Sequence, residues 1–342
     1  MCDFALLIDV WYRQNKRSLP WRDTKNAYHI WLSEVILQQT RVDQGKSYYL
    51  KFIENFPNVL DLARASEDEV LKLWQGLGYY SRARNLHAAA KNIVTNHQAQ
   101  FPDSYQEIRA LKGIGDYTAA AIASFAYDLP YAVVDGNVFR VLSRYYNDNT
   151  PIDSSQGKKL FTSYANELLN RKDPASFNQA IMELGALVCT PKNAKCEECP
   201  LLESCQGYRA NSVYELPVKS KKTKTRNRYF HYIYAPEEML LQKRTGKDIW
   251  ENMYEFPLLE VDSEREPSSI IVEIKEKLNF NVDENPIVAY KHILSHQHIY
   301  ATFWKLNSKP DEKKSSYISC SAMELNQYAI PRLIDKFLEE NN

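Results

Sequence analysis

The sequence predicts a mainly helical N-terminal region followed by an α+β region. Up to about residue 210, apolar residues recur at helical spacing, as in "NQAIMELGALV" and "DYTAAAIASFAYD". Between Lys219 and Arg228, six of ten residues are basic and no apolar face is present, which indicates an exposed linker. Short β-type runs such as "IYATFWKL" then alternate with helical stretches, as in α+β domains. We therefore expect a first domain at 1–212, a basic linker at 213–227 and a second domain at 228–342.

The composition is that of a soluble globular protein, with 342 residues of which 44% are hydrophobic and 25% are charged. The formal net charge is zero, so only local basic clusters can point to a nucleic-acid partner. The N-terminus lacks the basic region and cleavage site of a signal peptide, and no apolar run approaches the roughly 18 residues that cross a membrane. We expect a cytoplasmic protein with no membrane partner, in which thiols stay reduced.

One helical segment of the first domain, "LSEVILQQT", carries a carboxylate on its apolar side. Ile30, Trp31 and Leu37 lie three or four residues from Glu34 and share its helical face. Apolar surroundings disfavour the charged form and raise a carboxyl pKa above its ordinary value of about 4.3. Glu34 is therefore a candidate proton donor, and the alternative is a water-facing residue on the same helix.

The next feature is a glycine turn between two helical runs, in "LKGIGDYTAAAIASFA". Gly113 and Gly115 allow positive φ and close backbone approach, and the helix that starts near Asp116 offers free N–H groups to a phosphate. Further on, Asp135 precedes a helical run in "AVVDGNVFRVLSR" and is predicted to cap that helix. One raised and one ordinary carboxyl is the combination that glycoside cleavage requires.

Four cysteines crowd into "CTPKNAKCEECPLLESC" at the end of the first domain, with C-x6-C-x2-C-x5-C spacing. Four thiolates in one short loop can surround a zinc ion or an iron–sulfur cluster, and the spacing alone leaves both open. The predicted metal ligands are Cys189, Cys196, Cys199 and Cys205.

Together these motifs resemble the MutY adenine DNA glycosylases of the endonuclease III, or helix-hairpin-helix, glycosylase superfamily. The resemblance rests on the cysteine spacing, the Gly113–Gly115 hairpin, "GLGYYSRARNLH" and the "YEFP" that ends "QKRTGKDIWENMYEFP". It covers nearly the whole chain. It implies a six-helix barrel module with the helical hairpin, a module built around a [4Fe–4S] cluster, and a Nudix-like C-terminal domain. The hydrolytic Nudix box is missing, which argues against nucleotide hydrolysis. Lys112 stands where the family usually has proline, so we expect a looser hairpin entry.

Tyr117 separates two branches of that superfamily. Lyase members carry a lysine at this position, which attacks the sugar as a Schiff-base nucleophile, and a phenol cannot form an imine. The resemblance therefore implies a monofunctional adenine glycosylase. Two alternatives are a glycosylase-lyase of endonuclease III type acting on oxidised pyrimidines and a non-catalytic, damage-binding iron–sulfur protein.

The resemblance also implies roles for individual residues. Glu34 would protonate adenine and then help to activate water, and Asp135 would stabilise the cationic sugar, with Tyr117 and Asn137 in support. Residues matching the family's other functional motifs fall into three groups: the DNA-binding residues Gln39, Tyr79 (the wedge), Arg82, Gly113 and Gly115; the adenine pocket of Trp21, Arg22 and Gln179; and the 8-oxoguanine recognition residues Leu294, Ser295 and His296.

The implied partner is double-stranded DNA that contains adenine opposite 8-oxoguanine or guanine. We expect a monomer associated with the nucleoid. Leu294 replaces the family's phenylalanine in "HILSHQHIYATFW", so it offers an apolar contact without a ring to stack.

Overall fold

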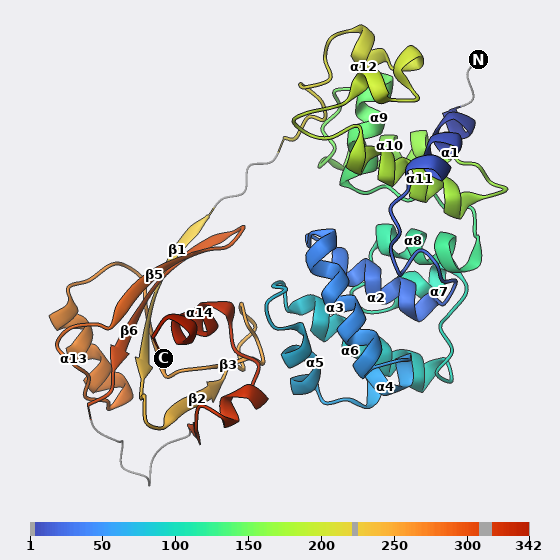
Figure 1. Ribbon diagram of the computed structural model, residues 1–342. Helices are drawn as coiled ribbons and strands as arrows, with labels where there is room; N and C mark the ends of the chain where they lie inside the picture. The colour runs from blue at the N-terminus through green and yellow to red at the C-terminus, as the bar shows by residue number, and fades with distance from the viewer. Residues whose placement is uncertain (1–3, 221–224, 308–316, 342) are drawn as a thin grey trace. The chain divides into compact units, whose positions relative to one another are not determined.

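The computed structural model describes residues 4–220, 225–307 and 317–341 (Figure 1). These residues form two compact units, each built from segments that are separated in the sequence. Among the described residues, unit 1 comprises 4–64 and 85–220, whereas unit 2 comprises 65–84, 225–307 and 317–341. A short segment inside the predicted first domain thus folds with the C-terminal residues.

Unit 1 is helical throughout its described part. Its helices are α1 (Phe4–Asn15), α2 (Ala27–Leu37), α3 (Val42–Asn55), α4 (Val59–Arg64), most of α6 (Ser81–Asn96), α7 (Tyr105–Ala110), α8 (Asp116–Tyr127), α9 (Gly136–Tyr146), α10 (Ser155–Leu168), α11 (Pro174–Leu187) and α12 (Gln206–Arg209), with the short 3₁₀ turns η1 (Cys196–Glu198) and η2 (Leu202–Ser204).

These helices pack in two groups. In one group α2 is the central helix and packs against α3 and α8. Nine of the eleven α2 residues are buried, because the helix is apolar almost all round and begins at the capping side chain of Asn26. In the other group α1, α9, α10 and α11 share a core that includes Ile8, Leu142, Phe161 and Leu184. Since α8 also contacts α11, the two groups meet at α8.

Unit 2 combines two sheets with helices. The larger sheet has the order β4-β1-β6-β5, with β1 and β6 parallel and the outer strands antiparallel, and the smaller has the order β3-β2-β7. The elements are α5 (Glu67–Trp74), β1 (Arg226–Tyr234), β2 (Met239–Lys243), β3 (Tyr254–Glu255), β4 (Leu258–Val261), α13 (Pro267–Leu278), β5 (Val288–Ile293), β6 (Gln297–Lys305), β7 (Ile318–Cys320), η3 (Glu324–Gln327) and α14 (Arg332–Asn341).

Helices α13 and α14 complete the core of unit 2. The buried Ile270 and Ile274 of α13 pack with Ile233 and Trp304 from β1 and β6. From α14, Phe337 stacks on Phe303 of β6 with ring centroids 4.0 Å apart. A helical first unit and an α+β second unit confirm the predicted fold class.

The predicted linker is only partly correct. Lys221, Lys222 and Lys224 lie outside the described residues, but β1 already begins at Arg226. Arg228 is buried, since its guanidinium pairs with Asp248 at 2.6 Å and with Glu260 at 2.6 Å. The basic run is therefore not exposed along its whole length: Arg228, the first residue of the predicted second domain, is buried and is neutralised by the partly exposed carboxylates of Asp248 and Glu260.

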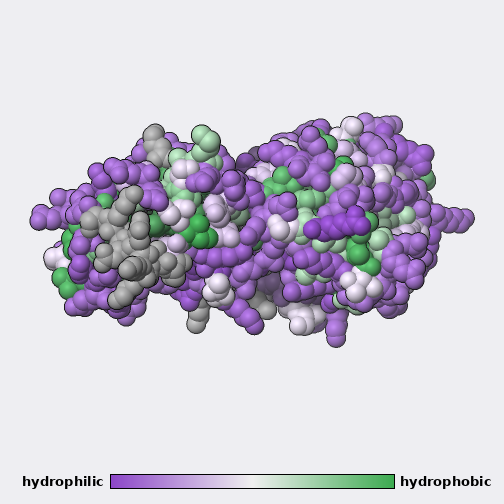
Figure 2. All heavy atoms as spheres, turned by 90° about the horizontal axis from the view of Figure 1, so that it is seen from below, coloured by the Kyte–Doolittle hydropathy of each residue, from purple (hydrophilic) through white to green (hydrophobic). Residues whose placement is uncertain are grey.

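On the face shown in Figure 2, hydrophilic residues predominate and hydrophobic residues form small separate groups. Within the described ranges, no helix combines the length and the apolar character that a membrane span requires.

Candidate active site

Glu34 lies in the last turn of α2 and is 7% exposed. The Tyr117 hydroxyl donates a hydrogen bond of 2.6 Å to its Oε2 atom. Burial raises the pKa of Glu34 to about 7, and the negative charge of Asp135 adds to the rise, whereas the bond from Tyr117 and the charge of Arg22 oppose it. At neutral pH the carboxyl group is therefore poised between its acid and base forms, as a proton donor and acceptor must be.

Tyr117 is positioned by the start of α8, directly after the glycine turn. Burial, then the charges of Glu34 and Asp135, raise the pKa of the phenol well above its ordinary value. The hydroxyl therefore remains a hydrogen-bond donor. Because this hydroxyl bonds Oε2 of Glu34, it also fixes the orientation of the other carboxyl oxygen, Oε1.

Asp135 caps helix α9, as predicted. Its Oδ1 atom accepts hydrogen bonds from the backbone N–H groups of Asn137 (2.9 Å) and Val138 (2.8 Å), and its Oδ2 atom accepts one from the Asn137 side chain (2.7 Å). Burial nevertheless raises the pKa of Asp135, and these bonds oppose the rise without cancelling it. The expectation of an ordinary carboxyl is thus modified, although three donors still favour the anion.

Arg140 holds Asn137 in place and escaped the sequence analysis. Its guanidinium donates to Asn137 Oδ1 (2.8 Å) and to the carbonyl oxygens of Gly185 (2.6 Å) and Cys189 (2.6 Å). The position of Asn137 also requires a glycine at residue 185, because a Cβ there would clash with the Asn137 Cβ at 2.7 Å. The sequence did contain a signal for this contact, because residues three apart on one helix, such as Asn137 and Arg140, lie on the same face.

A second ionic group surrounds Arg22, whose Nε atom donates to Gln179 Oε1 at 2.9 Å. Arg22 and Arg17 both bind the buried carboxylate of Glu183. Burial alone would raise the pKa of Glu183, but hydrogen bonds from Arg17 and Arg22 outweigh it and lower the pKa to about 2. Glu183 was not predicted, although it lies one turn beyond Gln179 on α11.

Trp21 contributes to the core of unit 1. It is 7% exposed and packs edge-on against Tyr49, with ring centroids 5.3 Å apart. Of the three predicted pocket residues, the structure thus brings Arg22 and Gln179 into direct contact and gives Trp21 a packing role.

The helical hairpin joins α7 to α8. Gly113 has a φ of +81°, and a Cβ at this position would lie 2.6 Å from the Cβ of Asn85. Gly115 is the N-cap of α8 and has no side chain to cover the first N–H groups of that helix. Lys112, three residues before Gly115, is exposed. These open N–H groups can hold a phosphate.

Comparisons with known proteins identify both parts of the chain. Residues 32–167 match the model of the HhH-GPD superfamily of base excision DNA repair proteins, and residues 228–340 match the NUDIX domain. An adenine DNA glycosylase of Buchnera aphidicola from Schizaphis graminum is 34% identical over 98% of both chains. Another, from Arabidopsis thaliana, is 34% identical over 80% of this chain and 50% of its own. The chain belongs to the adenine DNA glycosylase family.

Solved structures agree with this placement. A thermostable thymine-DNA glycosylase superposes with a TM-score of 0.56 and 28% identity, over 60% of this chain and 95% of its own. A non-covalent endonuclease III–DNA complex has a TM-score of 0.51 at 19% identity, with the same coverage, and so supports the fold. The predicted family and fold are confirmed. The protein is a DNA-binding base-excision repair glycosylase, an enzyme that hydrolyses N-glycosyl bonds.

The four cysteines of this family member line one cavity. Within the described ranges, no three His, Cys, Asp or Glu side chains meet closely enough to hold a single metal ion. The donor set nevertheless suits a cluster ligated by thiolates. Arg144 places its Nη1 atom 3.3 Å from Cys189 Sγ, and backbone N–H groups bond Cys199 and Cys205. Such donors stabilise coordinated thiolate sulfur.

Two of the predicted DNA-binding residues adopt left-handed backbone conformations. In unit 1, α2 ends at Leu37, so Gln39 lies beyond the helix in an exposed turn with a φ of +58°. This corrects the expectation that Gln39 extends the helix. In unit 2, Tyr79 has a φ of +48° and is 47% exposed. Arg82 supports this turn, because it donates to the Gly78 carbonyl at 3.2 Å and its guanidinium lies over the Tyr79 ring.

The predicted recognition residues form the turn between β5 and β6. Leu294 closes it with a backbone hydrogen bond to Gln297, while Ser295 and His296 are exposed and their polar side-chain atoms lie 3.3 Å apart. These residues line a cavity of about 500 Å³ in unit 2, and Tyr79 lines the same cavity.

Proposed function

We propose that this glycosylase hydrolyses the bond between adenine and deoxyribose in duplex DNA when adenine lies opposite 8-oxoguanine or guanine, and that it does so as a monofunctional, monomeric enzyme. The observation that carries the proposal is the hydrogen bond from Tyr117 to Glu34. It pairs a proton donor whose pKa is near 7 with a phenol at the position that a lyase would fill with an amine. Relatives named adenine DNA glycosylase support adenine as the base.

The chemistry divides between the two carboxyl groups. In its acid form, Glu34 donates a proton to the departing base, which leaves as a neutral molecule. The sugar then carries positive charge, and the Asp135 carboxylate stabilises it. Deprotonated Glu34 can next accept a proton from the attacking water. Because Tyr117 and Asn137 hold one carboxyl each, both groups are oriented before the DNA binds.

Unit 2 supplies the selection of the opposite base in this proposal. Ser295 and His296 present hydrogen-bonding groups on an exposed turn, where they can bond the edge of an oxidised purine. Leu294 offers an apolar side chain beside them. The absence of a phenylalanine predicts apolar contact with the neighbouring base rather than ring stacking.

We also propose that Cys189, Cys196, Cys199 and Cys205 hold a [4Fe–4S] cluster. The group would supply a structural cross-link for the loop that follows α11, and no step of the reaction needs it. Purified protein should be brown and absorb at about 410 nm, as thiolate-bound clusters do. Stoichiometric zinc without iron would overturn this assignment.

Single-turnover cleavage tests the proposed function. Duplexes that contain A:8-oxoguanine, A:G, A:C or thymine glycol are each mixed with excess enzyme, and the released base is identified. Adenine should leave the first two fastest, and borohydride should trap no robust covalent complex. Release of oxidised pyrimidine with efficient trapping would instead show a glycosylase-lyase, and no release of adenine from any duplex would refute the proposal.

A further inference from the structure

We propose that Arg84 and Glu251 are positioning residues that couple the recognition turn (Leu294–His296) to the wedge turn (Gly76–Tyr80), and so set the preference for the opposite base. The inference rests on the proposed function, because it concerns how that selectivity is transmitted. All the residues concerned belong to unit 2.

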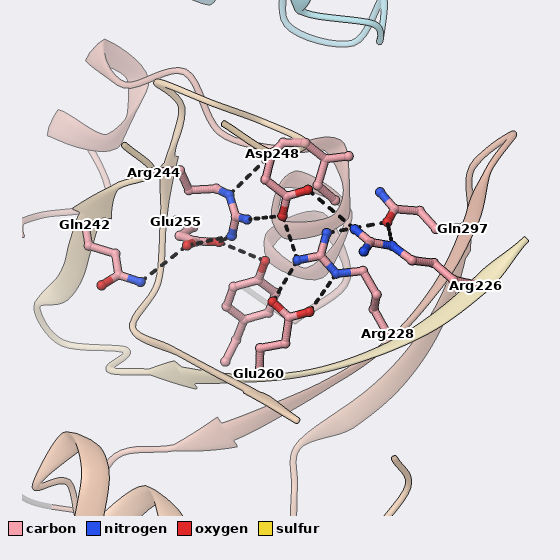
Figure 3. Close-up of polar contacts among 10 residues, drawn as sticks. Arg226, Arg228, Gln242, Arg244, Asp248, Glu255, Glu260 and Gln297 are labelled. Atoms are coloured by element: carbon pink, nitrogen blue, oxygen red, sulfur yellow. Dashed lines mark hydrogen bonds and ion pairs between the residues drawn. The ribbon is translucent and has the colours of Figure 1, made fainter. Parts of the chain in front are cut away.

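The coupling element is the loop between β2 and β3, from Arg244 to Met253. Asp248, near its middle, accepts from Arg228 (2.6 Å) and Arg244 (3.2 Å) and lies 3.7 Å from Arg226 (Figure 3). Arg226 and Arg228 in turn both donate to the side-chain oxygen of Gln297. Gln297 is fully buried and directly follows His296, so this ionic network supports one end of the recognition turn.

Three residues after Asp248, the same loop contacts Arg84, four residues beyond the end of the wedge turn. Arg84 donates from Nη2 to the Glu251 carboxylate (2.7 Å) and from Nη1 to the Glu251 backbone carbonyl (2.9 Å). The two side chains are only 17% and 26% exposed, so solvent screens this pair less than an ordinary surface pair. The bond to the backbone carbonyl fixes the course of the loop itself.

The loop is also held by its neighbours where it makes this contact. Trp250 and Asn252 flank Glu251 with φ values of +58° and +64°, and for a bulky residue such as tryptophan this left-handed conformation needs support from its surroundings. Trp250 is buried against Phe230 and against His292 of β5, the strand that leads into the recognition turn. Asn252 bonds Glu67 at the start of α5.

On the wedge side, the path from Arg84 to Tyr79 is short. Arg84 lies in the first turn of α6, and its backbone N–H bonds the carbonyl of Tyr80. Tyr79, Arg84, Trp250 and the recognition turn line one cavity. A base accepted at the recognition turn therefore holds the wedge turn in one place through packed, ion-paired groups. The residues proposed for the chemistry all lie in unit 1, so loosening this path should change selectivity more than the chemical step.

The test compares Glu251→Gln and Arg84→Gln with the charge exchange Arg84→Glu/Glu251→Arg. Lys277→Gln, which removes an exposed ion pair on α13, is the matched control. The measurement is the ratio of single-turnover adenine release from A:8-oxoguanine and A:G duplexes. We expect each single variant to lower the ratio about fivefold with A:G release retained, and the charge exchange to recover part of it, as contacting pairs do.

An equal loss of adenine release from both duplexes would overturn the proposal, because it would indicate that the pair contacts a phosphate or only supports the fold. An unchanged ratio would overturn it as well. Hydrogen exchange of the free protein gives a second readout that needs no activity: residues 76–84 should exchange faster in Glu251→Gln than in wild type or Lys277→Gln, and equal exchange would contradict the coupling. Failure of the wild type to release adenine would refute the proposed function, while the exchange experiment would still decide the coupling.

Discussion

At Glu34, burial and hydrogen bonding act on the same proton in opposite directions. Loss of solvent favours the neutral acid, while the Tyr117 hydroxyl stabilises the carboxylate, and the pKa settles near 7 because burial is the larger effect. Either effect alone would give a group fixed in one form at neutral pH. A donor that must later accept a proton needs both.

The first prediction concerns Tyr117→Phe. Base release requires the acid form of Glu34, so its rate should fall as pH rises through the pKa, with a midpoint near 7 in the wild type. Removing the Tyr117 hydroxyl removes a bond that lowers this pKa, so the midpoint should move to higher pH. Single-turnover rates between pH 5 and 9 measure it, and a midpoint that stays or falls would contradict the assigned role.

The second prediction is that Glu34→Gln abolishes base release but stabilises the fold. A carboxyl whose folded pKa is raised from 4.5 to about 7 stabilises the native state below pH 4.5 and loses that contribution as pH rises to 7. Glutamine keeps the acceptor for Tyr117 without the buried charge. Above pH 7 the gain should reach about 3 kcal/mol, from roughly 1.4 kcal/mol per pKa unit. Denaturant unfolding should show most of this gain at pH 8 and only a small part of it, less than about 1 kcal/mol, at pH 5.

Helical spacing predicted the apolar environment of Glu34, because its neighbours lie within four residues on one helix. The same reasoning did not find Glu183, whose partners Arg17 and Arg22 lie more than 160 residues away. Nor did it show that Arg228 is buried, since Asp248 and Glu260 reach it from other strands and loops. Contacts distant in sequence leave no periodic signal.

At the scale of elements, helix starts present the functional groups of unit 1. Asp135 caps α9, Tyr117 is the second residue of α8, and the glycine turn leaves the α8 N–H groups open. A helix start combines unpaired donors with a partial positive charge. It therefore suits both a carboxylate and a phosphate.

The third prediction tests the hairpin through Gly113→Ala. A Cβ at a φ of +81°, 2.6 Å from the Cβ of Asn85, should force the turn to shift. The expected cost is about 1–3 kcal/mol of stability, with weaker binding to any duplex whatever its base pair. Gly246→Ala is a suitable control, because a Cβ there meets open space. Equal melting temperatures and DNA affinities for the two variants would argue against the role given to this turn.

The types of most elements could be predicted from sequence patterns, but their ends less well. The stretch "LSEVILQQT" was predicted to be helical throughout, yet α2 stops at Leu37 and Gln39 adopts a left-handed backbone conformation. The basic run predicted a linker that ends at residue 227, yet β1 starts at Arg226 because β6 pairs with it there. Tertiary pairing sets these limits.

At the scale of the whole molecule, the segment 65–84 folds with residues that follow it by more than 150 positions. Asp68 pairs with Lys243 and Tyr254, Lys72 bonds the Tyr328 carbonyl, and Arg84 pairs with Glu251. The sequence placed this segment in the first domain, where the family match also lies. The predicted wedge therefore depends for its support on the C-terminal residues.

The last prediction follows from the packing of residues 65–84 with the C-terminal part of the chain. A chain that ends at residue 220 should leave residues 65–84 without the partners of Asp68, Lys72 and Arg84, because all of them lie beyond the cut. Their amides should then exchange hydrogen faster than in the full chain, whereas α8 and α9, which belong to unit 1, should keep their protection. Exchange followed by mass spectrometry compares the two chains. Unchanged exchange at 65–84 would show that unit 1 alone can order the wedge, and selection of the opposite base would then need another physical basis.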